Sequence, residues 1–423
     1  MNSSAPSLVD LVAAGVFGVA LLHTFAAKQL DRLSHRFPRH AGLFHLLGEV
    51  EVVFGFWAIV LVLALALMVD GSYALRYAES RNYAEPLFVF VVMVIAASKP
   101  VLDTVRGCVN AVARVVPLPK RVARAWLGLA AVPLTGSLIT EPAAMTIAAL
   151  MLSPIVFRRE LPEAAKYLAL GVLFVNVSIG GTLTSYAAPP VLMVATTWQW
   201  DSAFMLAQFG WKAALAVIVN ATIATMALRA HLAVDSHDQT GASSQHRAPL
   251  AVVVVHLALL AGVVLMAHHP VIFLGLFLMF LGFAQAYERH QNPLIIKEAL
   301  LVAFFLAGLV VLGGLQRWWL QPIVTALEPM ALFFGALGLT AITDNAALTY
   351  LGSLIPTISD DAKYMLVAGA VAGGGLTVIA NAPNPAGVAL LKTGFSDESI
   401  SAGGLLLGAL LPTIVAAGAL LLL

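Results

Sequence analysis

Long apolar blocks recur along this chain, and they constrain its fold more than any other feature. Many blocks hold roughly 18 to 25 residues, the length at which a helix crosses the hydrocarbon core of a bilayer. Segments such as Val52–Met68 and Leu250–Ala267 have almost no polar positions, so they lack the polar face that a helix in a soluble protein needs. The chain is 60% hydrophobic and only 11% charged. We therefore expect an all-α integral membrane protein whose main partner is the lipid bilayer.

The apolar blocks predict about ten transmembrane helices and two re-entrant hairpins. The predicted spans cover residues 7–27, 50–70, 85–113, 163–195, 203–231, 250–267, 271–288, 297–320, 361–391 and 401–423. The predicted hairpins, 126–157 and 330–357, are too long for one helix and are broken by polar residues at their centres. The most polar stretch, 233–248, is predicted to be a flexible cytoplasmic linker between two halves, 1–232 and 249–423.

Lysine and arginine gather on one side of this predicted topology. The crowded side holds Lys28, Arg32, Arg36, Arg39, Arg114, Lys120, Arg121, Arg124, Arg158, Arg159, Lys166, Arg229, Arg247, Arg289 and Lys297. The other side holds only Arg76, Arg81, Lys212, Arg317 and Lys363. The positive-inside rule places the crowded side in the cytoplasm, so both termini are expected outside. The first hairpin then opens from the cytoplasm and the second from the outside.

Several classes of function are disfavoured by composition and by missing motifs. A formal charge of +1 provides no basic field for nucleic acid. A single cysteine, Cys108, excludes an internal disulfide and a multi-cysteine metal site. No His-Glu-x-x-His or Gly-x-Ser-x-Gly pattern occurs, so we expect neither an enzyme nor a bound cofactor.

Short motifs repeat in the same order in the two halves. The segments 139–146 and 342–349 are identical at five of eight positions. The glycine-rich segments 180–184 and 373–377 follow them, and each leads into a proline-rich stretch. A weaker pair, Lys99-Pro100 and Gln321-Pro322, precedes the hairpins. Because five spans per half is an odd number, the second half starts on the opposite side of the membrane. This inverted repeat predicts a binding site near mid-membrane, where the halves meet.

Two acids, Glu141 and Asp344, lie at the centres of the predicted hairpins. A carboxylate at that depth costs on the order of 3 kcal/mol or more, which marks a candidate functional site. The apolar surroundings favour the protonated acid, so it can exchange protons, whereas the ionised acid can coordinate a cation. Hydroxyl and amide oxygens for a cation are available in Thr140, Thr184, Thr343, Asn345, Thr377, Asn381 and Asn384. The alternative interpretation is that each acid caps a local helix.

Other charged residues have two interpretations each. Lys99 and Asp103 are four positions apart and could form a helical ion pair, or Lys99 could neutralise Glu141 in one state of a coupling cycle. Glu49 and Glu51 begin the second predicted span, where an interfacial cap is favoured over an ion pathway.

The acidic hairpin motifs resemble the ion transporter superfamily, which includes NhaD-type sodium/proton antiporters, arsenite efflux permeases and divalent-anion/sodium symporters. Within it, the chain is most similar to a group of bacterial sodium/proton antiporters. The resemblance rests on Thr-Glu-Pro at 140–142, Thr-Asp-Asn at 343–345, the Gly-Gly-x-Leu-Thr elements ending at Thr184 and Thr377, and the stretch 381–385. It covers nearly the whole chain. The neutral tips of the divalent-anion branch are absent.

This resemblance implies an inverted-repeat secondary transporter of the bacterial inner membrane, often a homodimer, with sodium and protons as its ions. By motif position it implies an ion-binding set of Thr140, Glu141, Thr184, Thr343, Asp344, Asn345, Thr377 and Asn381. Pro142 stands where the second half has Asn345, so the Asp344 side is the better sodium candidate, with Asn345 and Thr377 as further ligands.

The leading hypothesis is that a monovalent cation, most simply sodium, is exchanged for protons by alternating access. The alternative is an anion transporter, for a dicarboxylate or arsenite, coupled to sodium or protons. Two acids at one site would repel an anion, whereas helix N-termini alone would attract it. Sodium-driven dicarboxylate uptake would favour the alternative.

Overall fold

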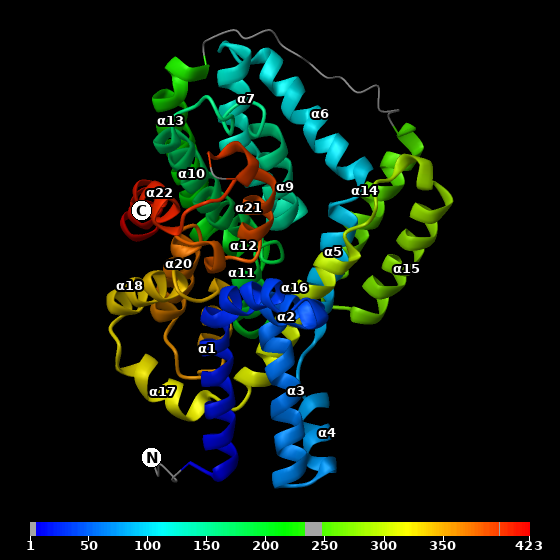
Figure 1. Cartoon of the computed structure of the whole chain (residues 1–423), viewed down its shortest axis with the longest axis vertical. Helices are drawn as coiled ribbons and strands as arrows, with labels where there is room; N and C mark the ends of the chain where they lie inside the picture. Colours follow the sequence, from blue (N-terminus) through cyan, green and yellow to red (C-terminus); the bar gives the residue numbers. More distant parts are fainter. Residues whose placement is uncertain (1–5, 233–247, 397) are drawn as a thin grey trace.

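A computed structural model describes residues 6–232, 248–396 and 398–423 (Figure 1). Every regular element in these residues is a helix. The predicted linker, 233–248, lies outside the described residues except for its last position.

The helices before the linker form the first half of the chain. They are α1 (Leu8–Arg36), α2 (Ala41–Gly48), α3 (Val50–Met68), α4 (Gly71–Glu79), α5 (Ala84–Ala96), α6 (Lys99–Val115), α7 (Lys120–Leu129), α8 (Ala131–Ile139), α9 (Glu141–Leu152), α10 (Glu163–Gly180), α11 (Pro189–Trp198), α12 (Ser202–Met205) and α13 (Trp211–Leu232). A π-helical turn, Leu206–Gly210, joins α12 to α13.

The helices after the linker form the second half. They are α14 (Leu250–Leu265), α15 (Pro270–Ala286), α16 (Ile296–Gly313), α17 (Arg317–Ala326), α18 (Pro329–Thr340), α19 (Asn345–Ser353), α20 (Asp360–Gly373), α21 (Asn384–Leu391) and α22 (Ala402–Leu422). Helices α14 and α15 stand along one side of the molecule, and α18 and α22 lie on the other (Figure 1).

Several helices are suited to a bilayer by length and composition. Among the described residues, four segments could each cross a membrane: Glu163–Leu183, Ser202–Leu232, Ile296–Gly313 and Ala402–Leu422. The number rises to 7 if each of three bent helix pairs is one span, including α5 with α6, bent by 66°, and α7 with α8, bent by 40°. Five further apolar helices are shorter. The chain is therefore a multi-pass membrane protein by its helices, while the predicted count of ten spans stays a prediction.

Large apolar side chains cover much of the outer surface. Leu67 is 89% exposed, Val271 85% and Leu407 71%. A soluble protein rarely leaves so much apolar surface in water, whereas lipid tails solvate it well. The surface thus fits the same conclusion as the helix lengths.

Both predicted glycine- and proline-rich segments break their helices. Helix α10 ends at Gly180, is followed by the 3₁₀ turn Gly181–Leu183, and resumes as α11 at Pro189. Helix α20 ends at Gly373, is followed by extended backbone and the 3₁₀ turn Val378–Ala380, and resumes as α21 at Asn384. Prolines in the first turns of α11 and α21 donate no amide hydrogen, which suits a helix start but not a helix interior.

Helix contacts interlock the two halves. Helix α10 crosses α20, α9 packs on α21, and α11 packs on α19. Each half thus packs the second segment of its broken helix on the helix that follows the acidic turn of the other half. This arrangement brings residues that are far apart in sequence to one centre. We call α8–α9 and α18–α19 the first and second hairpins and their turns the tips, while a re-entrant path through the membrane stays a prediction.

Candidate functional site

The crossing of α10 and α20 fixes the position of both helix breaks. The hydroxyl of Ser178 donates to the carbonyl oxygen of Val371 at 2.8 Å. A Cβ atom added at Gly374 would overlap the Ser178 hydroxyl oxygen, and one added at Gly375 would overlap the backbone of Val175. Only glycine lets the two helices approach so closely.

Replacing Gly375 with alanine should separate these helices. The added methyl group meets backbone atoms that cannot turn away, and such overpacking typically costs about 1–3 kcal/mol. We expect Gly375→Ala to lower the apparent melting temperature of the purified protein and to slow any transport that it performs. Gly282→Ala on α15 is the matched control, because a Cβ atom there meets nothing within 4 Å. Equal melting temperatures for the two variants would contradict this account of the crossing.

A threonine at each helix break bonds to the hairpin of its own half. The Thr184 hydroxyl donates to the carbonyl oxygen of Ser137 at 2.7 Å. The Thr377 hydroxyl donates to the carbonyl oxygen of Ala341 at 2.8 Å. Both carbonyls lie near the C-terminal end of a hairpin helix, where backbone oxygens lack intrahelical donors. The two predicted threonines therefore hold the breaks against the hairpin tips.

Glu141 is fully buried at the first hairpin tip. Its Oε2 accepts a hydrogen bond of 2.7 Å from the side-chain nitrogen of Asn381 in the other half. Its Oε1 accepts none from the described residues and would lie 2.5 Å from a Cβ atom added at Gly181. The preceding Thr140 has φ 77°, a region that costs a non-glycine residue about 1–3 kcal/mol. The acid is thus held in a tight, strained turn.

Asp344 occupies the second hairpin tip and caps α19. Its Oδ1 accepts from the amide nitrogens of Ala346 at 2.8 Å and Ala347 at 3.2 Å. The capping interpretation is therefore correct for Asp344. It does not apply to Glu141, which is the first residue of α9: the N-cap of that helix is Thr140, and it makes no side-chain capping hydrogen bond.

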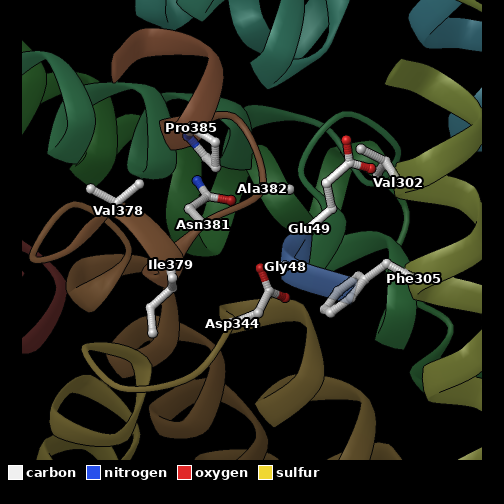
Figure 2. Close-up of a pocket in the computed structure, with 10 residues that line it drawn as sticks. All are labelled: Gly48, Glu49, Val302, Phe305, Asp344, Val378, Ile379, Asn381, Ala382 and Pro385. Atoms are coloured by element: carbon white, nitrogen blue, oxygen red, sulfur yellow. The ribbon is translucent and has the colours of Figure 1, made fainter. Parts of the chain in front are cut away.

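A cavity of about 250 Å³ lies beside Asp344. We call it the Asp344 cavity, and it is lined by Gly48, Glu49, Val302, Phe305, Asp344, Val378, Ile379, Asn381, Ala382 and Pro385 (Figure 2). The Asp344 carboxylate and the Asn381 side-chain oxygen point into it, and Glu49 lies on the far side next to Val302 (Figure 2). The side-chain nitrogen of Asn381 thus bonds to Glu141, while its side-chain oxygen points into the Asp344 cavity.

Three asparagines near the tips present buried side-chain oxygens. The oxygens of Asn345, Asn381 and Asn384 accept no hydrogen bond from the described residues. The Asn384 nitrogen donates to the carbonyl oxygens of Gly374 at 2.8 Å and Thr377 at 2.9 Å, which fixes the orientation of its amide. Buried acceptors without donors suit a bound cation or water.

Not all of the predicted residues gather here. Thr343 donates to the Leu339 carbonyl oxygen and lines a separate apolar cavity with Phe17 and Leu21. Lys99 forms its ion pair with Asp103 within α6, and Arg106 lies 3.7 Å from the same acid. This confirms the helical-pair interpretation and leaves a contact between Lys99 and Glu141 without support.

Two residues that shape the site, Ser137 and Ser178, are not among the residues predicted from the sequence. Ser137 binds the other side of the first break, accepting from the Leu183 amide at 2.9 Å and donating to the Gly180 carbonyl oxygen at 2.7 Å. The sequence feature that could have identified Ser178 is a polar side chain in an apolar segment, close before the glycine pair 180–181. Asn384 was recognised only as a source of oxygen.

Helices throughout the described residues, an apolar outer surface, and a buried and a half-buried acid near polar side chains define a membrane transport protein. The family described as "Putative Na+/H+ antiporter" matches residues 8–423, so the chain belongs to that family. Membership supports cation/proton antiport and a transporter rather than an enzyme, and gives no support to anion transport. It does not bear on the closer likeness to NhaD-type antiporters or arsenite permeases. No curated protein matches the chain.

Proposed function

We propose that this protein exchanges sodium for protons across the inner membrane of a bacterium by alternating access. One observation carries the proposal: Asn381 links the buried Glu141 to the cavity that contains Asp344. A group that holds a proton and a group that attracts a cation are thus joined through one amide. Occupation of one acid then changes the electrostatic energy at the other, which is the requirement for coupled exchange.

The two acids have different surroundings, so we assign them different roles. Asp344 lines a cavity into which the Asn381 oxygen also points, so Asp344 is the proposed cation ligand. Asn345 and Thr377 adjoin the lining residues Asp344 and Val378 in sequence and remain proposed further ligands. Glu141 is fully buried with one bonded oxygen, so it is the proposed proton carrier. Two acids at one centre also argue against an anionic substrate.

Corresponding contacts in the two halves support the inverted repeat. Phe305 of α16 packs edge-on against Phe54 of α3 at 5.1 Å between ring centroids. Phe88 of α5 packs in the same manner against Phe273 of α15 at 5.7 Å. The two phenylalanine pairs are equivalent contacts in the repeat if α3 of the first half corresponds to α15 of the second, and α5 to α16. Each half would then hold five spans and one hairpin, with the boundary at 233–248.

A second cavity supports alternating access. It measures about 610 Å³ and is lined by residues of α5, the first helix break, α11 and the α14–α15 turn, among them Glu85, Ser185, Tyr186, Leu192 and His268. Ser185, Tyr186 and Leu192 correspond in the repeat to Val378, Ile379 and Pro385 of the Asp344 cavity. Charge sorting puts Glu49 on the cytoplasmic side and Glu85 on the outer side. We propose that the two cavities give access from opposite sides.

A transport assay across several cations tests the function. Purified protein is reconstituted in vesicles with an acidic lumen and a pH-sensitive dye, and sodium, lithium, potassium or calcium salts are added. We expect sodium to collapse the pH gradient and calcium to leave it intact. A gradient unaffected by every cation, together with sodium-driven dicarboxylate uptake, would replace the proposal with the anion alternative.

A further inference from the structure

Glu49 is an acid of the first half that reaches the cation cavity of the second half. It occupies the N-cap position of α3, but its side chain makes no capping hydrogen bond. It lies instead on the wall of the Asp344 cavity, across from Asp344 (Figure 2). The interfacial cap predicted for Glu49 is therefore not its role in this structure.

The position of Glu49 is at the boundary between the cavity and the surface. Its side chain is 21% exposed, and its Oε1 lies 3.8 Å from the ammonium nitrogen of Lys297 at the start of α16. The Lys297 side chain is 73% exposed. An ion pair with so exposed a partner is weak and readily exchanged. Glu49 thus stands between a replaceable surface cation and the inner cavity.

The part of the cavity beyond Glu49 indicates what kind of ligand it can bind. The Asn381 side chain is 1% exposed, and its oxygen accepts no hydrogen bond from the described residues while pointing into the cavity (Figure 2). Val302, Phe305 and Ile379 supply apolar walls. Apolar walls around negative groups focus the electric field and concentrate cations. A mostly apolar cavity with an acid at each end and the Asn381 oxygen between suits a small cation.

We propose that Glu49 is the residue at which a monovalent cation first enters the Asp344 cavity, and that Lys297 is its replaceable counter-ion. The arriving cation displaces the Lys297 ammonium group beside Glu49 and then moves to Asp344 and Asn381. The inference rests on the proposed antiport function and adds a second cation position to it. The contacts with the cation are ionic at Glu49 and Asp344 and ion–dipole at Asn381, so no covalent step is involved.

The test measures the half-saturating sodium concentration and the maximal exchange rate separately. In vesicles with equal amounts of protein, we expect Glu49→Gln to raise the half-saturating concentration roughly tenfold, with a maximal rate close to wild type, because attraction at the mouth is lost. Glu49→Asp should recover most of the affinity. Lys297→Gln should lower the half-saturating concentration, because no ammonium group competes with sodium.

The matched control is Glu298→Gln, which removes an exposed acid next to Lys297 that does not line the cavity. An unchanged half-saturating concentration in Glu49→Gln, or a loss confined to the maximal rate, would overturn the inference. If Glu49→Gln inserts poorly into the membrane, Lys297→Gln still tests the inference. An unchanged or raised half-saturating sodium concentration in Lys297→Gln would also refute it. A wild-type protein that exchanges no cation would instead refute the antiport function itself.

Discussion

Asp344→Asn is expected to reduce sodium-dependent collapse of a pH gradient to background, a loss of roughly 100-fold or more for a central charged ligand. Asparagine has nearly the same shape as aspartate and is an equally good N-cap, so the bonds to Ala346 and Ala347 can persist. The variant therefore removes charge from the cavity with little effect on α19. The measurement is dye-monitored exchange, joined by sodium/sodium counterflow with radiolabelled sodium, and both should be lost.

The control for this variant is Asp361→Asn. Asp361 is an exposed acid in the first turn of α20 that lines none of the described cavities, so the substitution makes the same charge change in the same half. It should exchange sodium like the wild type. Normal exchange by Asp344→Asn at equal protein amounts would rule out Asp344 as the cation ligand.

The fold class and both helix breaks could be predicted from sequence because their causes are local. Apolar length alone dictates that a segment prefers lipid, and glycine pairs followed by prolines end a helix wherever they occur. The hairpin acids stood out for the same reason, since Glu141 and Asp344 interrupt apolar segments. Motif repetition added the pairing of Thr184 with Thr377 before any contact was known.

The contacts of the site could not be predicted, because they depend on how the helices cross. Nothing in the motif order shows that Asn381 bonds to Glu141 of the other half or that Glu49 reaches the Asp344 cavity. The first contact depends on the α10–α20 crossing at Gly374 and Gly375, and the second on the packing of α3 against α16. The same geometry turns Thr343 toward a different cavity, although Thr343 and Asp344 are neighbours in sequence.

Polar residues in apolar spans were similarly ambiguous from sequence alone. Asn176 donates to the Leu129 carbonyl oxygen at 2.7 Å, at the end of α7, and accepts from Asn220 at 3.0 Å. Asn220 also donates to the carbonyl oxygen of Pro412 in α22. The first bond satisfies a backbone oxygen at the break between α7 and α8, and together the bonds tie α10, α13 and α22 to one another. Buried asparagines can therefore stabilise packing in one place and, like Asn381, line a cavity in another, and only their partners distinguish the two positions.

Glu141→Gln is expected to abolish proton-coupled exchange while leaving sodium/sodium counterflow measurable. Glutamine has the volume of glutamate, so it fits beside Gly181, and its oxygen can still accept from the Asn381 nitrogen at the same place. What disappears is the group that binds and releases a proton. The Asp344 cavity keeps its charge, so sodium can still bind and cross in exchange for sodium.

The roles proposed for the two acids are distinguished by measuring proton-coupled exchange and sodium/sodium counterflow separately. Asp344→Asn should lose both exchange modes, whereas Glu141→Gln should lose only the mode that moves protons, by roughly 100-fold in the dye assay. Glu160→Gln, an exposed acid after the first hairpin, controls for charge removal in the same half. Loss of counterflow together with proton coupling in Glu141→Gln, in a protein that melts like the wild type, would mean that both acids bind the cation. The roles proposed for the two tips would then have to be merged into a single site that binds either sodium or protons.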